Sequence, residues 1–157
     1  MLSYGLGDAG TGLVATQLGF YLFPFFTGTA GLPALMAGSL LMVIKVWDAI
    51  NDPLIGWMSD HTNTRWGPRL PWMIGGAAPL GISLAAMWWV PQGDLNQKTT
   101  YYILIAILLM TAYTSVNLPF AALSTELTED TRVRTRLNAA RFTGSILAGL
   151  SGLIIAA

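Results

Sequence analysis

The chain has 157 residues, of which 54% are hydrophobic and only 10% are charged, and its formal net charge is zero. Ordinary soluble domains carry about 25% charged residues, so this composition excludes a typical water-soluble domain. The lack of net positive charge argues against a nucleic-acid partner, and the absence of cysteine excludes a disulfide scaffold or a cysteine-based zinc site.

Five apolar stretches, taken in chain order, predict an all-α bundle of transmembrane helices. A helix needs roughly 20 apolar residues to cross a bilayer core. The sequence offers such stretches over about residues 2–26, 33–59, 71–90, 100–125 and 138–157. The last stretch stops without a polar flank. We therefore expect four complete helices and a truncated fifth, which together form an incomplete N-terminal transmembrane half.

Basic residues gather in loops on one side of the predicted bundle. The loops after the second and fourth stretches contain Arg65, Arg69, Arg132, Arg134 and Arg136, whereas the opposite loops contain only Lys98. Lysine and arginine collect in cytoplasmic loops. The pattern predicts a multi-pass protein of the cell inner membrane, surrounded by lipid, with a cytoplasmic N-terminus.

Glycines are frequent in the first and last stretches, for example Gly10, Gly12, Gly144 and Gly152. Small residues let helix backbones approach each other closely in lipid, so these glycines predict tight helix packing. A second interpretation of the first stretch is that its glycines leave room for a ligand or let the helix bend during gating.

The second stretch contains charged side chains at a depth where a membrane helix is normally apolar. Asp48 and Asp52 are four residues apart, so their carboxylates lie on one helix face. Counted from Asp60 at about 1.5 Å per residue, Asp52 lies roughly 12 Å and Asp48 roughly 18 Å along the helix. Ionisable groups inside a membrane cost at least about 2.5 kcal/mol each and usually mark an ion path. Two adjacent carboxylates repel each other unless a cation or proton lies between them, so the pair predicts a coupling-ion site.

Neighbouring residues extend this prediction and also offer an alternative. Asn51 can add an amide oxygen, the kind of ligand that hard cations prefer. Pro53 loosens the helix ladder and frees a carbonyl oxygen. In the alternative interpretation, Lys45 neutralises Asp48 three residues later, and Asp52 reaches the cytoplasmic headgroups.

The fourth stretch contains a polar stripe of Tyr113, Thr114 and Asn117. These side chains can hydrogen-bond a hydroxyl-rich ligand or a neighbouring helix, and the pattern alone does not separate the two. Arg141, at the entry to the fifth stretch, is either a site residue or an ordinary cytoplasmic anchor. Asp8 in the first stretch is a further candidate for a buried acid.

The loop after the second stretch predicts an ion-pair latch. Asp60 ends the apolar stretch, and Arg65 and Arg69 follow across a short loop. Pairs between an acid at a helix end and these arginines can hold helices together on one side of the membrane. The alternative is an ordinary positive cytoplasmic loop with incidental pairing.

Short motifs along the whole chain resemble one family of sugar transporters. They are residues 2–8 (LSYGLGD), 47–53 (WDAINDP), 65–72 (RWGPRLPW), 117–120 (NLPF) and 140–142 (ARF). Their order and spacing resemble the glycoside–pentoside–hexuronide:cation symporters of the major facilitator superfamily, whose best-known member is melibiose permease.

The resemblance implies a fold of twelve helices in two halves around a central sugar site, which works by alternating access. This chain corresponds to the first four helices and most of the fifth, so the missing C-terminal half is needed for transport. The resemblance also implies a sugar or glycoside substrate and a coupling ion that is Na⁺ or H⁺, with no other cofactor or metal.

The resemblance further implies roles for particular residues. The residues that match the cation site are Asp48, Asp52, Asn51 and Thr114. Those that match positions at the sugar site are Tyr113, Asn117, Arg141 and Gly12, and those that match the gating loop are Asp60, Arg65 and Arg69. Gly12 stands where melibiose permease has a sugar-binding aspartate, and Asn117 stands where it has an acid. Selectivity for galactosides is therefore not implied.

The predicted function is cation-coupled symport of a glycoside, pentoside or hexuronide. The alternative is a non-transporting membrane scaffold, accessory subunit or sensor built on a transporter fold, which has little need for acids inside the membrane. An intramembrane protease would hold its two aspartates on different helices. Because Asp48 and Asp52 share one helix, we expect no enzymatic activity.

Overall fold

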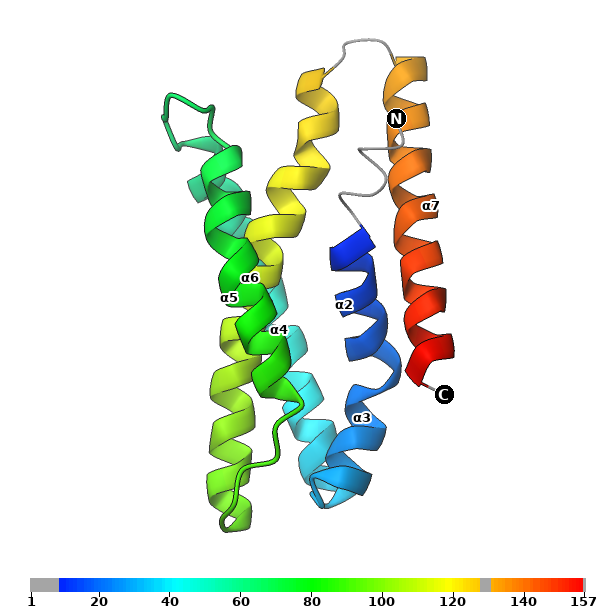
Figure 1. Cartoon of the computed structure of the whole chain (residues 1–157). Helices are drawn as coiled ribbons and strands as arrows, with labels where there is room; N and C mark the ends of the chain where they lie inside the picture. Colours follow the sequence, from blue (N-terminus) through cyan, green and yellow to red (C-terminus); the bar gives the residue numbers. More distant parts are fainter. Residues whose placement is uncertain (1–8, 128–130, 157) are drawn as a thin grey trace. The chain divides into compact units, whose positions relative to one another are not determined.

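A computed structural model describes residues 9–127 and 131–156 of the chain (Figure 1). The regular elements among these residues are helices, which confirms the predicted all-α class. In chain order they are α2 (Ala9–Phe20), α3 (Leu22–Pro24), the π-helix η1 (Phe25–Thr29), α4 (Ala34–Asp60), α5 (Leu70–Met87), α6 (Leu95–Leu127) and α7 (Thr131–Ala156).

The helices belong to two compact units. The smaller unit contains α2, α7 and the end of α6 from Pro119 onward. The larger unit, Phe23–Leu118, contains η1, α4, α5 and the rest of α6. Pro119 lies inside α6 at the boundary, where it removes one helical N–H donor. Asp48, Asp52 and Thr114 all belong to the larger unit.

Three helices in the described part of the chain are long and apolar enough to cross a membrane, namely Ala34–Asp60, Leu70–Met87 and Leu95–Ala122. They cover the second, third and fourth predicted stretches. Large apolar side chains are exposed on their surfaces, among them Leu35, Met42, Ile74, Ile82 and Leu104. Extensive exposed apolar surface is typical of proteins that face lipid, and the protein is a multi-pass membrane protein.

The first predicted stretch is not one continuous helix. α2 ends at Phe20, and the chain continues through α3 into η1, which Ala30 N closes with a bond of 2.9 Å to Phe25 O. Pro24 has no N–H to donate, so the α-helical ladder is interrupted just before η1. Gly31, with a φ of +70°, then reverses the chain ahead of α4. Part of the segment between the first two predicted stretches, residues 27–32, is therefore helical.

Aromatic rings pack η1 against the ends of α5 and α6. Phe25 lies edge-on to Trp88 with ring centroids 4.9 Å apart, and the ring of Phe26 lies 4.9 Å from that of Tyr102. Edge-on ring pairs add stabilisation beyond the burial of their surfaces. Lys98 donates a hydrogen bond of 3.1 Å to the backbone carbonyl that follows η1. These contacts hold the η1 end of α4 to its two neighbours.

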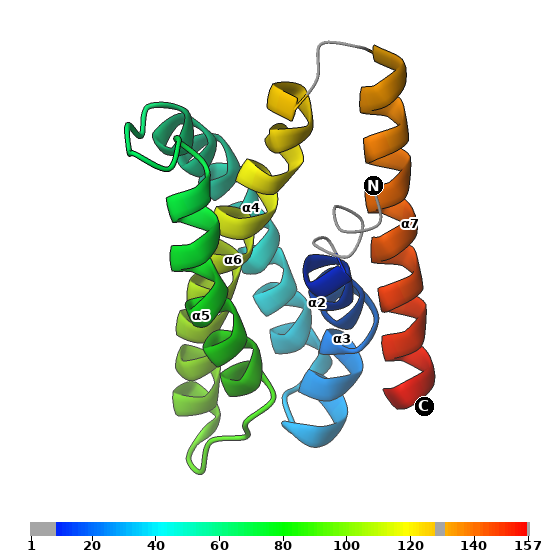
Figure 2. The same cartoon turned by 45° about the horizontal axis from the view of Figure 1, so that its top comes forward.

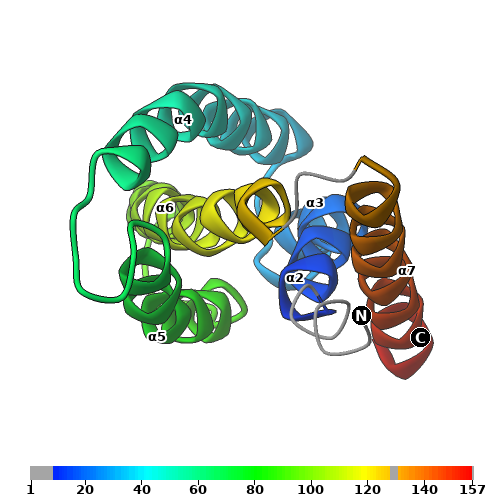
Figure 3. The same cartoon turned by 90° about the horizontal axis from the view of Figure 1, so that it is seen from above.

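Within the larger unit, α6 lies between α4 and α5, as the view from above shows (Figure 3). α5 approaches α6 at Gly76, where an added Cβ would lie 2.9 Å from Val116 and 3.1 Å from Ser115. The Tyr101 hydroxyl on α6 donates to Ala86 O on α5 at 2.8 Å. α5 therefore fixes one side of α6, while the opposite side is available to α4.

In the smaller unit, α2 packs along α7 (Figures 1 and 2). An added Cβ on Gly12 would lie 2.5 Å from the Cα of Ser145, so the two backbones are as close as glycine allows. An added Cβ on Gly152 would lie 3.5 Å from Leu13. The tight packing that we predicted from the glycines is thus confirmed at Gly12.

Candidate functional site

The two membrane aspartates lie on α4, a helix of 27 residues. Asp48 and Asp52 are one turn apart and both are half-buried, whereas the neighbouring Asn51 is only 1% exposed. Pro53 lies inside the same helix and has no N–H, so the carbonyl of Ala49 has no donor four residues later. This turn of α4 therefore gathers carboxylate, amide and carbonyl oxygens.

Hydrogen bonds join this turn of α4 to α6. The Thr114 hydroxyl donates to Asp52 Oδ1 at 3.0 Å, and the Asn51 amide donates to Met110 O at 3.4 Å. Thr114 itself is only 1% exposed. The structure thus brings together Asp52, Asn51 and Thr114, three of the four residues that we expected at a cation site. The fourth, Asp48, lies one turn away on the same helix.

The charges around Asp48 do not cancel. The negative charge of Asp52 and the positive charge of Lys45 both act on Asp48. Lys45 is exposed, and among the described residues no ion pair joins it to Asp48. Two carboxylates and one ammonium leave an excess negative charge on this part of α4. Inside a membrane, an excess charge of this kind favours binding of a cation or proton.

Two of the expected sugar-site residues flank the threonine that binds Asp52. Tyr113 and Asn117 are four residues apart on α6, so they share one helix face, and both are half-buried. Thr114 follows Tyr113 directly, and its hydroxyl contacts Asp52 on α4. A ligand bound at this face of α6 would therefore lie next to the candidate cation site.

The other two expected sugar-site residues belong to the smaller unit. Gly12 lies against Ser145 of α7, where an added Cβ would lie 2.5 Å from the Ser145 Cα. The guanidinium of Arg141 lies 5.9 Å from the ring centroid of Phe120 and 5.8 Å from that of Phe142. Rings at this distance attract the positive charge of an arginine. Asp8, the further candidate acid, lies outside the described residues.

The loop between α4 and α5 contains one of the expected ion pairs. Arg69 Nη2 lies 3.5 Å from Asp60 Oδ1. Arg65 instead stacks on Trp66, with its guanidinium 4.7 Å from the ring centroid. Gly67, with a φ of +85°, closes the turn. Of the two arginines predicted to form a latch, Arg69 contacts the acid and Arg65 contacts an aromatic ring.

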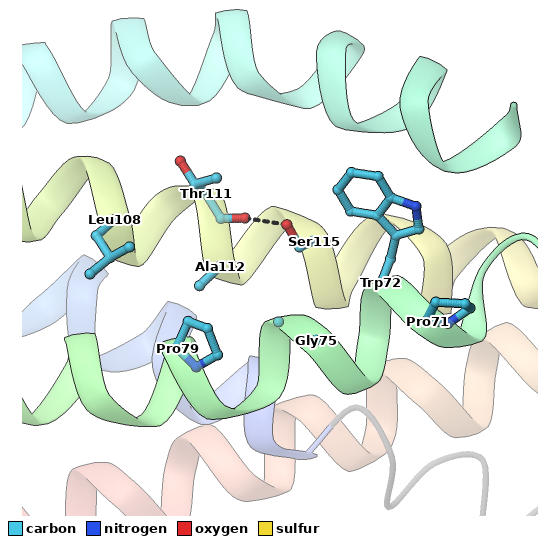
Figure 4. Close-up of a pocket in the computed structure, with 9 residues that line it drawn as sticks. Pro71, Trp72, Gly75, Pro79, Leu108, Thr111, Ala112 and Ser115 are labelled. Carbon is cyan, nitrogen blue, oxygen red and sulfur yellow. Dashed lines mark hydrogen bonds between the residues drawn. The ribbon is translucent and has the colours of Figure 1, made fainter. Parts of the chain in front are cut away.

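The cavity between α5 and α6 contains none of the residues that we expected at the site. It has a volume of about 430 Å³ and is mostly apolar. Its lining residues are Pro71, Trp72, Gly75, Gly76, Pro79, Leu108, Thr111, Ala112 and Ser115 (Figure 4). Its walls carry no charged side chain, so it does not resemble a site for an ion.

Sequence reasoning missed one contact beside the candidate cation site. The indole N–H of Trp47 donates to Thr111 Oγ1 at 3.1 Å. Trp47 directly precedes Asp48, and Thr111 lies one turn before Thr114. Trp47 belongs to the 47–53 motif, but no pattern in the sequence pairs it with a threonine 64 residues later.

Comparison with known proteins identifies the family. The sequence pattern of the family described as MFS/sugar transport protein matches residues 3–157. The chain belongs to this family, which confirms the resemblance to symporters of the major facilitator superfamily.

Several relatives are named as symporters. The chain is 47% identical to an uncharacterized symporter of Synechocystis, over 98% of this chain and 29% of the relative. It is 38% identical to a putative glycoside/cation symporter of Escherichia coli, over 90% of this chain and 31% of the relative. It is 30% identical to a sodium-dependent lysophosphatidylcholine symporter of Danio rerio, over 97% of this chain and 29% of the relative. The chain thus spans less than a third of the length of each of these relatives.

Proposed function

We propose that this chain is part of a cation-coupled sugar symporter that works by alternating access. The observation that carries the proposal is the hydrogen bond from Thr114 to Asp52, one turn from Asp48, on helices that can cross a membrane. A protein with no ion to carry has little reason to keep two carboxylates there. Family membership and the symporter relatives support the same function.

In this proposal the coupling cation binds between Asp48 and Asp52. The two carboxylates supply negative charge, and Asn51 and Thr114 supply further oxygens. The cation removes the repulsion between the carboxylates and stabilises the arrangement of α4 against α6. The cation favours a state of the protein that also binds sugar more tightly. Because this coupling of two ligands is reciprocal, it links the cation gradient to the sugar gradient.

The sugar binds next to the cation in this proposal. Tyr113 and Asn117 share a face of α6 beside Thr114, and their hydroxyl and amide groups suit a ligand rich in hydroxyls. Arg141 on α7 and Gly12 on α2 are further residues that we propose for sugar binding, from the family resemblance. A glycoside, pentoside or hexuronide is the proposed substrate class, and the glycoside/cation symporter among the relatives supports it.

In this proposal the protein lies in the cell inner membrane. Its N-terminus and the α4–α5 loop face the cytoplasm. Arg65 and Arg69 in that loop support this orientation, since basic residues collect on the cytoplasmic side. The pair of Arg69 with Asp60 then forms a latch at the cytoplasmic end of α4, and its opening accompanies the change of access.

The coupling ion is Na⁺ or H⁺. Oxygen ligands from two carboxylates, an amide and a hydroxyl suit Na⁺, and one relative is named as sodium-dependent. A proton can neutralise the same pair of carboxylates without the other oxygens. An imposed gradient of each ion separates the two alternatives.

The test is uptake by proteoliposomes that contain the complete product of the gene. Radiolabelled glycosides, pentosides and hexuronides are offered under an inward Na⁺ gradient, an inward proton gradient or no gradient. We expect one gradient to drive accumulation above the external concentration, and an ionophore for that ion to abolish it. If neither gradient stimulates uptake of any sugar that binds the protein, the proposal is wrong and a sensor on a transporter fold is favoured.

A further inference from the structure

The contact between Trp47 and Thr111 is one of the hydrogen bonds that join α4 to α6 near the aspartates. Its length is 3.1 Å from the indole nitrogen to the hydroxyl oxygen. Two further bonds involve Asn51 and Asp52, so the three fall within six residues of α4, which span about 7.5 Å of helix. They therefore fix the same short length of α4 against α6.

The hydroxyl of Thr111 is directed by two partners. It donates to Ile107 O one turn earlier on α6 at 2.7 Å, and it accepts the indole N–H of Trp47. Its single hydrogen is therefore used within α6, and a lone pair is turned toward α4. An indole N–H that loses its acceptor inside a membrane has no water to replace it, so the pair is costly to separate.

Thr111 and Thr114 are three residues apart, so they lie on the same side of α6, one turn from each other. A small rotation or slide of α6 moves both threonines together. Thr114 holds Asp52 at 3.0 Å, a distance at which a shift of a few tenths of an ångström weakens a hydrogen bond. The Trp47–Thr111 contact therefore sets where the Thr114 hydroxyl stands relative to the carboxylate.

The side of α6 that packs on α5, which includes Ser115 one turn after Thr111, leaves little freedom for compensation. Ser115 donates to Thr111 O at 2.7 Å, as the dashed line in Figure 4 marks. Gly76 of α5 packs directly on this face, with no room for a methyl group beside Ser115 and Val116. Packing on α5 therefore holds one side of α6, and hydrogen bonds to α4 hold another.

We infer that Trp47 and Thr111 are a positioning pair that sets the affinity of the cation site without touching the cation. The inference rests on the proposed function, because it concerns the same Asp52 site. It goes beyond that proposal by naming two residues outside the ligand set and the contact through which they act. Neither residue was expected at the site from the sequence.

The test compares Thr111→Val, which keeps the shape but loses the hydroxyl, with Thr111→Ser, which keeps the hydroxyl. Trp47→Phe removes the donor from the other side. Two quantities are measured on the purified complete protein: the cation concentration for half-maximal uptake, and the sugar affinity at saturating cation. Loss of one hydrogen bond between membrane helices predicts a rise of about three- to fifteenfold in the half-maximal cation concentration.

We expect Thr111→Val and Trp47→Phe to raise the half-maximal cation concentration. In Thr111→Ser this concentration should stay within about twofold of the wild type. Sugar affinity at saturating cation should be unchanged in all three variants. Thr100→Val is the matched control, since the Thr100 hydroxyl is exposed and, among the described residues, bonds only to Asn96 O of its own helix at 2.9 Å. The inference is overturned if Thr111→Val behaves like the control, or if its serine counterpart is equally impaired.

The Asp52→Asn variant, measured in parallel, separates failure of the inference from failure of the proposed function. If it keeps cation-driven uptake, the proposed cation site is wrong, and the inference falls with it. If it loses cation-driven uptake while Thr111→Val has a normal half-maximal cation concentration, the site stands and only the positioning role is refuted.

Discussion

Replacing Thr114 with valine removes the hydroxyl that binds Asp52 and leaves the size and branching of the side chain unchanged. Thr114 is 1% exposed, so valine fits the same buried position on α6. The change removes the hydrogen bond of 3.0 Å to Asp52 Oδ1 and one of the oxygens proposed for the cation. The carboxylate of Asp52 then loses the contact that holds it toward α6.

The expected magnitude follows from this one contact. A hydrogen bond to a charged group contributes about 1.5–3 kcal/mol. Because Asp52 is only half-buried, the lower end of this range applies. At about 1.4 kcal/mol for each factor of ten, the cation affinity should fall about tenfold. Serine at the same position keeps the hydroxyl and should keep the affinity within about threefold.

The assay is sugar uptake by proteoliposomes at a series of cation concentrations, with equal amounts of wild type, Thr114→Val and Thr114→Ser. The half-maximal cation concentration should rise only in the valine variant, and sugar exchange at saturating cation should persist in all three. If the valine variant responds to the cation as the wild type does, Thr114 is an interhelical contact and not part of the cation site.

Three further predictions concern packing and orientation. Gly76→Ala should lower the thermal unfolding temperature, because overpacking costs about 1–3 kcal/mol. Gly75→Ala, with nothing within 4 Å of the new Cβ, should leave this temperature unchanged. Equal effects of the two variants would contradict the described α5–α6 contact. Gly12→Ala should also lower this temperature, by pushing α2 away from α7, and unchanged stability would refute that packing. The chain has no cysteine, so a cysteine at Asn63 should react only from the cytoplasm and one at Gln92 only from outside, and the reverse pattern would invert the topology.

Sequence patterns were sufficient for the helical class and for placing the two aspartates on one face of the same helix. Hydropathy located the three helices that can cross a membrane, because a bilayer demands long apolar stretches. The spacing of Asp48 and Asp52 fixed their common face, because helix geometry is local. The contact of Thr114 with Asp52 is not local: 62 residues separate the two, and although the polar stripe included Thr114, only the family resemblance assigned it to the cation site.

Sequence patterns failed where structure depends on features other than hydropathy. The helix α7 begins at Thr131, ahead of the apolar stretch predicted from about residue 138, because arginine and leucine favour a helix outside the membrane as well as inside it. The π-helix η1 continues past residue 26, where the first predicted stretch ends, since aromatic packing and Pro24 decide its backbone. The partner of Trp47 depends on the register of α4 against α6, which no spacing within one helix reveals.

The most direct test of the proposed cation site compares two modes of transport in the Asp52→Asn variant of the complete protein. Proteoliposomes report cation-driven accumulation of a labelled sugar and, separately, passive exchange of that sugar with the cation equal on both sides. We predict that the variant loses accumulation and retains exchange, because the neutral amide no longer requires a cation beside Asp48. Accumulation at the wild-type level would contradict the assignment of the coupling site to this pair.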